Sequence, residues 1–238
     1  MLKDMDVSEK RKIIAANVEA VRRRIAEACR RSGRGENDVQ LVAVTKTVGP
    51  EEVRILAELG LTDLGENRIQ KAEPKIAASP GSLRWHMIGH LQRNKVKKTL
   101  ELFHRIDAVD SLKLAEEISR RSQQKGAVTP VLIEVNTGGE EAKFGVSPQD
   151  VPELAVKIAG LPNITVEGLM TMAPFTDDMD VCRACFRELR RTADSLRGRE
   201  SATLRMRHLS MGMTQDFEVA VEEGATMVRI GTALFKGL

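Results

Sequence analysis

The sequence predicts an α/β fold, a single (β/α)8 TIM barrel with one extra helix at its amino terminus. Short apolar runs alternate with amphipathic helical patterns along the chain, and this alternation is typical of a parallel sheet covered by helices. About eight strand–helix units follow one another without a linker, and 238 residues is a usual length for a closed barrel of this kind. We therefore expect one domain over residues 1–238.

The first predicted strand has the clearest pattern. Residues 39–44 are apolar at nearly every position and too few for a helix, which indicates a strand buried on both faces. Before it, residues 8–32 repeat apolar side chains every three or four positions, as an amphipathic helix does. After it, Pro50 and two acidic residues mark the first turn of another helix.

The same alternation predicts the other elements. Strands are expected at residues 62–66, 84–88, 105–109, 130–135, 164–170, 205–210 and 227–230. Helices are expected at residues 68–77, 91–102, 112–124, 151–159, 179–196 and 214–222, before a terminal turn at 234–237. The strand at 62–66 has the weakest apolar pattern of these elements.

Composition excludes several classes of protein. The chain has 37 basic and 34 acidic residues, and only 3% aromatic residues, so we expect no nucleic-acid partner. Its first residues lack the apolar core of a signal peptide, and no apolar run has the length of a membrane span, which predicts a cytoplasmic protein. The pair Cys182 and Cys185 falls in a helical pattern without a second pair, so a structural role is favoured over a metal site.

Lys46 is the first candidate functional residue. In a barrel of this kind, functional residues gather at the carboxyl ends of the strands, and Lys46 follows the first strand. Two interpretations are open. It is either a surface lysine whose stem lies along apolar side chains, or a partly desolvated amine that can form a Schiff base.

Two later strand ends have the composition of anion sites. Ser210-Met211-Gly212 joins a strand to a predicted helix start, where backbone N–H groups favour a phosphate, and Gly231-Thr232 follows the last strand. Phosphate sites in these barrels commonly use the loops after strands seven and eight. Together with Lys46 across the barrel mouth, the two segments favour a phosphorylated aldehyde, and pyridoxal 5′-phosphate (PLP) fits that description.

Motifs along the chain match a known family in order. They are VAVTK at 42–46, GEN at 65–67 with Gln70, HMIGHLQRNK at 86–95, VN at 135–136, KFG at 143–145, EGLM at 167–170, LSMGM at 209–213 and VRIGT at 228–232. With these motifs the chain resembles the pyridoxal-phosphate homeostasis proteins over nearly its whole length. The resemblance implies the barrel of the alanine racemase amino-terminal domain, without the carboxyl-terminal β domain of that enzyme.

The resemblance also implies a cofactor site. Its residues would be Lys46, Asn67, His86, Ser210, Met211, Gly212, Arg229, Gly231 and Thr232. Lys46 would hold PLP as a Schiff base, the segments at 210–212 and 231–232 would hold the phosphate, and Asn67 would lie near the ring. Arg229 would face the pyridine nitrogen, the alternative being a surface arginine at a strand end. His86 is equally well interpreted as a core histidine.

The same residues favour a carrier over an enzyme. A guanidinium stays protonated, so an arginine at the ring nitrogen leaves the ring a poor electron sink. Alanine racemase uses a lysine and a tyrosine as opposed bases, and this chain contains no tyrosine. We therefore expect a non-enzymatic, monomeric PLP-binding protein that buffers or delivers the cofactor, with PLP-dependent apoenzymes as possible recipients.

Three further hypotheses stay open. One is a weak PLP-dependent amino-acid racemase or lyase in which His86 or another strand-end residue is the partner base. Another is a phosphosugar aldolase in which Lys46 forms a Schiff base with the substrate. The third assigns Lys143 as a secondary amine for cofactor hand-off, against the alternative of a solvated surface lysine.

Overall fold

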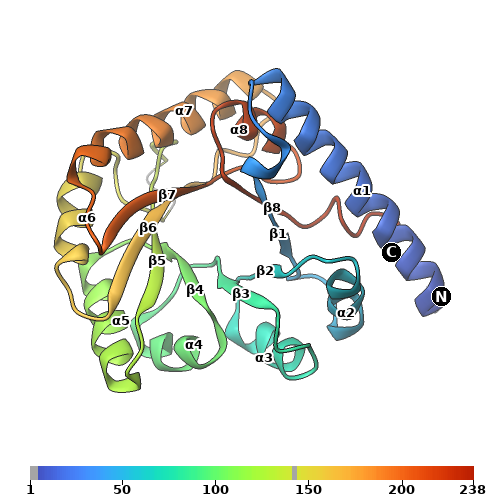
Figure 1. Ribbon diagram of the computed structural model, residues 1–238, viewed down its shortest axis with the longest axis horizontal. Helices are drawn as coiled ribbons and strands as arrows, with labels where there is room; N and C mark the ends of the chain where they lie inside the picture. Colours follow the sequence, from blue (N-terminus) through green and yellow to red (C-terminus); the bar gives the residue numbers. More distant parts are fainter. Residues whose placement is uncertain (1–4, 141–143) are drawn as a thin grey trace.

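The computed structural model describes residues 5–140 and 144–238, and within them eight parallel strands close into a barrel in chain order, with helices outside the strands (Figure 1). The strands are β1 Gln40–Val44, β2 Asp63–Glu66, β3 Arg84–Met87, β4 Arg105–Val109, β5 Thr129–Glu134, β6 Ile164–Met170, β7 Leu204–Ser210 and β8 Met227–Ile230. The helices are α1 Val7–Arg31, α2 Pro50–Glu58, α3 Ile69–Ala77, α4 Val96–Leu102, α5 Leu112–Lys125, α6 Val151–Ala159, α7 Met179–Leu196 and α8 Phe217–Glu222. The predicted fold, a TIM barrel with an extra amino-terminal helix, is confirmed.

The barrel interior is separate from the main hydrophobic core. The main core lies between the strands and the helices, whereas Ala108, Leu132 and Met170 form a small cluster of their own from β4, β5 and β6. Because successive strand residues point to opposite faces, the interior-facing residue after Leu132 is Glu134. The last interior positions of the strands therefore form a layer at the carboxyl end of the barrel.

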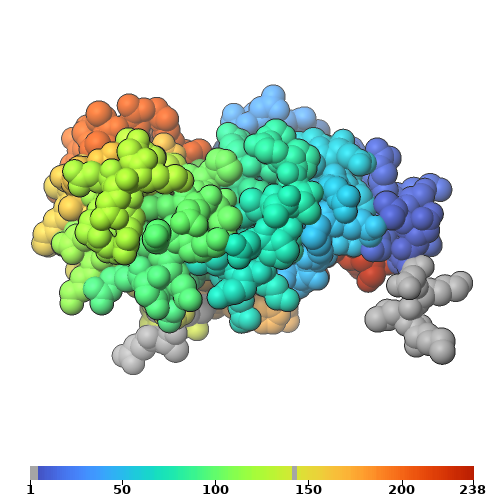
Figure 2. All heavy atoms as spheres, turned by 90° about the horizontal axis from the view of Figure 1, so that it is seen from below, coloured from blue at the N-terminus to red at the C-terminus, as the bar shows by residue number. Residues whose placement is uncertain are grey.

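Helix α1 precedes the barrel and packs along its side. Its buried residues have the predicted helical spacing and are Ile14, Val18, Val21, Ile25, Ala28 and Cys29. The side chain of Asn17 donates hydrogen bonds to the carbonyl oxygens of Leu234 (3.2 Å) and Lys236 (2.9 Å). These bonds hold the carboxyl-terminal segment against α1, and Figure 2 shows this red segment beside the blue helix.

Two predicted boundaries are informative. The weak strand at 62–66 is present as β2, where all four residues are buried. The predicted helix at 214–222 begins only at Phe217, because the Met213 N–H donates to the side chain of Asp216 (2.6 Å) and residues 213–216 form a turn instead. Lys143 lies outside the described residues.

Helix α7 carries the Cys182 and Cys185 pair on its buried face. Their thiols lie 3.9 Å from the carbonyl oxygen of Pro174 and 3.8 Å from that of Thr137. Both acceptors belong to loops that follow barrel strands, so the pair packs α7 against these loops. Across residues 5–140 and 144–238, no cluster of His, Cys, Asp or Glu could hold a metal ion. None of the helices in these ranges is long and apolar enough to cross a membrane.

Candidate functional site

A cavity of about 470 Å³ opens at the carboxyl ends of the strands. Its wall comes from the loops after β1, β2, β3, β6, β7 and β8, together with Arg229 inside the barrel. The lining residues are Val44, Lys46, Thr47, Asn67, Ile88, Gly89, Met172, Pro174, Phe175, Thr176, Met213, Thr214, Gln215, Asp216, Arg229, Gly231 and Thr232. Five of the nine predicted site residues line the cavity, namely Lys46, Asn67, Arg229, Gly231 and Thr232.

Lys46 lies on a tight turn at the rim of this cavity. The turn closes through a hydrogen bond from the Val48 N–H to the Thr45 carbonyl oxygen (3.1 Å). The Lys46 amine has no hydrogen bond or ion pair with any residue of the described ranges. The side chain is exposed, which agrees with the surface-lysine interpretation of the two, because the turn carries Lys46 beyond the buried end of β1. The structure thus provides a free primary amine at the cavity.

Arg229 is a buried cation on β8, the strand that pairs with β1, and it lies beside Val42 in the register of the two strands. Lys46 and Arg229 therefore lie on neighbouring strands and not across the barrel mouth from one another. Arg229 is 4% exposed, which excludes the surface-arginine alternative. Its guanidinium donates to the Ser210 hydroxyl (2.7 Å) and the Thr171 carbonyl oxygen (2.8 Å), so two of its five N–H groups meet neutral acceptors. Burial lowers the pKa of Arg229, partly offset by surrounding carboxylates. Its unused donors are available to a ligand.

Two buried carboxyl groups lie close enough to influence this cation. Glu134, the last residue of β5, is 3% exposed, and burial with the neighbouring charge of Asp110 raises its pKa to about 7, against the opposing effect of Arg229. Its Oε2 atom has no hydrogen-bond partner among the described residues. Asp216 lines the cavity, and burial raises the pKa of its carboxyl group as well. Neither carboxylate forms a direct ion pair with Arg229 in the described chain, so the cation is left available at the cavity.

Backbone N–H groups on the wall are a second set of free donors. Those of Thr214, Gln215, Gly231 and Thr232 have no acceptor among the described residues. All four belong to the loops after β7 and β8, where the sequence predicts an anion site. Thr214 and Gly231 are half-buried, whereas Gln215 and Thr232 are exposed, so these N–H groups are open to water or to an anionic ligand in the cavity.

The segment Ser210-Met211-Gly212 lies behind the wall. Ser210 accepts the hydrogen bond from Arg229, and Met211 is fully buried in the main core. Gly212 has a φ of +92°, and a Cβ atom there would lie 2.6 Å from the Cβ atom of Ala220. These residues support the wall through Arg229 and α8, and their direct contact with a ligand stays a prediction.

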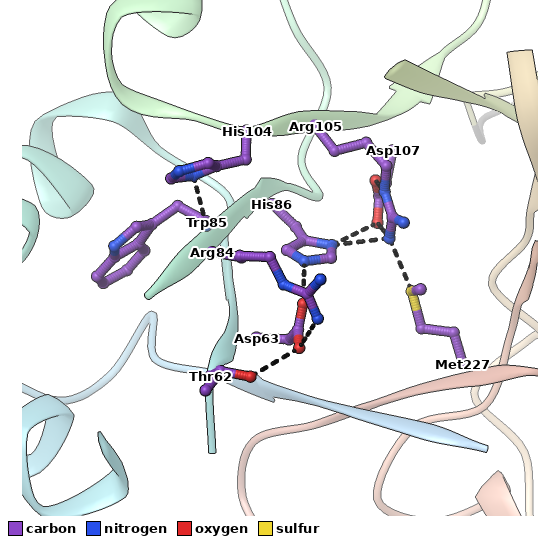
Figure 3. A network of polar contacts seen from close by, with 9 residues as sticks. All are labelled: Thr62, Asp63, Arg84, Trp85, His86, His104, Arg105, Asp107 and Met227. Carbon is purple, nitrogen blue, oxygen red and sulfur yellow. Dashed lines mark hydrogen bonds and ion pairs between the residues drawn. The ribbon is translucent and has the colours of Figure 1, made fainter. Parts of the chain in front are cut away.

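His86 lies one interior layer below the cavity, in the polar network of Figure 3. Its Nε2 atom is 3.0 Å from Asp63 Oδ1, and its Nδ1 atom is 2.8 Å from Arg105 Nη2 and 3.4 Å from Asp107 Oδ2. Arg105 also donates to Asp107 (2.6 Å) and to the sulfur of Met227 (2.9 Å). His86 does not line the cavity, and its surroundings are those of the core-histidine alternative.

Several residues at the site were not singled out from the sequence. Glu134 could have been identified by the same pattern as Lys46, because it is a charged residue at the end of an apolar strand. Asp216 falls within the helix predicted at 214–222, where a carboxylate is expected on the solvent face, and Phe175 belongs to a loop, where no periodicity indicates a direction for the side chain. Phe175 is 87% exposed at the cavity mouth, a position that only the folded loop after β6 reveals.

Comparisons with known proteins agree with this geometry. The family described as the alanine racemase N-terminal domain matches residues 16–238. A pyridoxal phosphate homeostasis protein of Aquifex aeolicus is 47% identical over 213 residues, covering 89% of this chain and 92% of that protein. One of the same name from Pseudomonas aeruginosa is 41% identical over 228 residues, covering 93% and 94%. The structure of PipY from Synechococcus elongatus with PLP bound matches with a TM-score of 0.81 and 32% identity, covering 93% and 99%.

Proposed function

The chain belongs to the family of pyridoxal phosphate homeostasis proteins, and from this premise we propose that it binds PLP in the barrel cavity and buffers or delivers it inside the cell. One observation carries the proposal: a free amine, a buried guanidinium with unused donors and unpaired backbone N–H groups face a single cavity. An amine suits an aldehyde, and N–H groups suit a phosphate. The donor set therefore fits a phosphorylated aldehyde.

Each residue has a stated part in this proposal. Lys46 supplies the amine that attaches the cofactor as a Schiff base, and Gly231 and Thr232 bind the phosphate through their N–H groups. Arg229 faces the pyridine nitrogen, held in place by Ser210. Asn67 lies near the ring. The backbone of Gly89 packs directly against that of Asn67, since a Cβ atom on Gly89 would lie 2.6 Å from the Asn67 carbonyl oxygen.

When bound, PLP supplies an aldehyde for attachment and a ring that can withdraw electrons. The residues of this chain favour attachment alone. Arg229 keeps its proton and cannot readily pass one to the ring nitrogen, and no tyrosine is present to act as a second base. We propose a non-enzymatic carrier, with racemase activity as the alternative outcome of the test.

The wider setting is proposed from family likeness. The chain would form one cofactor-binding barrel over residues 1–238, act in the cytoplasm as a monomer, and pass PLP to PLP-dependent apoenzymes.

The test is a titration of the purified protein with PLP, followed by visible absorption, beside a Lys46→Ala variant. The proposal expects a visible band for the wild-type protein and none for the variant. The loaded protein is then incubated with L- and D-amino acids and analysed by chiral chromatography. Turnover that disappears in Lys46→Ala would establish the racemase alternative. A protein that stays colourless throughout the titration with PLP would refute the proposal.

A further inference from the structure

A buried ion pair lies just outside the barrel wall, next to the cavity. The Nζ atom of Lys75 in α3 is 2.5 Å from Oε1 of Glu66 in β2, and the two side chains are 4% and 0% exposed. The same Nζ atom donates to the Thr45 carbonyl oxygen at 2.5 Å. The Thr45 hydroxyl donates to Glu66 Oε1 at 2.7 Å. These three residues form the Thr45–Glu66–Lys75 cluster, which links α3 to the ends of β1 and β2.

Two members of the cluster come directly before residues that line the cavity. Thr45 precedes Lys46, and its carbonyl oxygen accepts both the Lys75 amine and the N–H that closes the Lys46 turn. Glu66 precedes Asn67, which also lines the cavity. A displacement of the cluster would therefore move the Lys46 turn relative to the rest of the wall.

Stability alone does not account for a buried ion pair at this place. Removing two charges from water costs about as much as their attraction returns, and apolar side chains of similar size often stabilise a protein equally well. In addition, the Oε2 atom of Glu66 has no hydrogen-bond partner among the described residues, so the pair is incompletely satisfied. What a charged pair does provide is a fixed direction for each hydrogen bond, and here Lys75 and Glu66 each bond to Thr45, at the base of the Lys46 turn.

The ladder between β1 and β2 ends close to the cluster. The last paired residues are Val44 and Gly65, followed by one hydrogen bond from the Thr45 N–H to the Gly65 carbonyl oxygen (3.1 Å). Beyond that bond, the hydrogen bonds of Thr45 to Glu66 and Lys75 continue to connect the two chain segments as they reach the cavity. We propose that Lys75 and Glu66 are positioning residues that orient the Lys46 amine for covalent attachment of an aldehyde ligand, an inference that rests on the proposed PLP function.

Attachment and simple binding make different demands on the site. In attachment, a C=N double bond forms between Lys46 Nζ and the aldehyde carbon as the C=O double bond breaks, and the oxygen leaves as water with the two protons of the neutral amine. This step needs the amine at a defined distance and angle. Binding of the ring and phosphate uses Arg229 and the backbone N–H groups and does not need the amine. Loss of the cluster should therefore weaken attachment and spare binding.

The decisive variant is the double substitution Glu66→Gln with Lys75→Met, which removes both charges and keeps the volume of the side chains. Covalent attachment is followed by the visible band during titration with PLP. Simple binding is followed with pyridoxine 5′-phosphate, which carries the same ring and phosphate but an alcohol in place of the aldehyde. We expect the attachment constant to fall about tenfold or more, the analogue affinity to stay within about twofold, and the melting temperature to be unchanged.

A matched control is available on the same helix. Glu73 of α3 forms an exposed ion pair with Lys98 of α4 (2.6 Å), and the double variant Glu73→Gln with Lys98→Met should change neither attachment nor binding. Thr45→Val is a milder test, because it removes only the hydroxyl bond to Glu66 and should lower attachment by a smaller factor. It keeps the inference testable if the double variant fails to fold.

Equal attachment by the wild-type protein and a folded cluster variant would overturn the inference. So would a parallel loss of attachment and analogue affinity, since that is the result of a merely structural role. A wild-type protein that binds neither PLP nor the analogue would instead refute the proposed function.

Discussion

Glu134 offers a quantitative test of the charge environment inside the barrel. Its carboxyl group is 3% exposed and its Oε2 atom is unpartnered within the described chain, so burial disfavours the charged form and raises the pKa from 4.5 to about 7. A carboxyl group with a raised pKa binds its proton more tightly in the folded state. Its contribution therefore favours folding at low pH and is lost as the pH rises from about 4.5 to about 7.

The magnitude follows from the two pKa values. At about 1.4 kcal/mol for each pH unit, the rise to about 7 corresponds to about 3 kcal/mol of stability lost on ionisation. Glu134→Gln removes the ionisation and keeps the shape of the side chain. At pH 8 the variant should be more stable than the wild-type protein by about 3 kcal/mol, or about 6–12 °C in melting temperature for a chain of this length. Below pH 4.5 this advantage should vanish.

Urea and thermal unfolding between pH 4 and pH 8 would measure this difference, with exposed Glu19→Gln as the control. Stability curves for wild type and Glu134→Gln that run parallel over the whole range would refute the argument, because they would show that Glu134 ionises as freely as a surface glutamate.

Three further outcomes follow from the barrel core and the cavity wall. Arg105→Met leaves the fully buried Asp107 carboxylate without its closest cation, and should lower the free energy of unfolding by about 3–5 kcal/mol; an unchanged urea midpoint would contradict the ion pair. Gly212→Ala places a Cβ atom 2.6 Å from the Cβ atom of Ala220, on a backbone with a φ of +92°. The variant should therefore lower the melting temperature by more than about 2 °C, and calorimetry that finds no loss would show that the turn can relax. Phe175→Ser should change stability by less than about 0.5 kcal/mol, because the ring is 87% exposed; a larger loss would mean that Phe175 packs in the core.

The fold could be predicted from the sequence because each strand is a short apolar run between helical patterns. Even the weak strand at 62–66 is present as β2, since closure of the barrel requires a strand between β1 and β3. The late start of α8 could not be predicted from periodicity. It depends on the side chain of Asp216, which accepts a hydrogen bond from the Met213 N–H and keeps residues 213–216 in a turn before the helix begins.

The site was predictable in outline because strand ends meet at one mouth of a barrel. Lys46, Arg229 and the Gly231-Thr232 segment line one cavity, as the order of the strands implies. The depth of each residue was not predictable. Ser210 supports Arg229 from behind the cavity wall. His86 lies one layer below the cavity, because interior positions recur every two residues along a strand, and a shift of two residues moves a side chain from the cavity into the core.

The cluster behind Lys46 shows a further limit. Glu66 belongs to the GEN motif at 65–67 and Lys75 to a predicted helix nine residues further on, and nothing in the sequence indicates that the two side chains meet. Only the fold brings α3 over the end of β1 and buries both groups.

The most direct test of the central claim is borohydride reduction of the PLP-loaded protein, followed by peptide mass mapping. A free amine at the cavity rim predicts one reduced PLP adduct per chain, on the peptide that contains Lys46, and no adduct at the cavity in Lys46→Ala. An adduct found chiefly on another lysine, or a wild-type protein that takes up no PLP, would contradict the account.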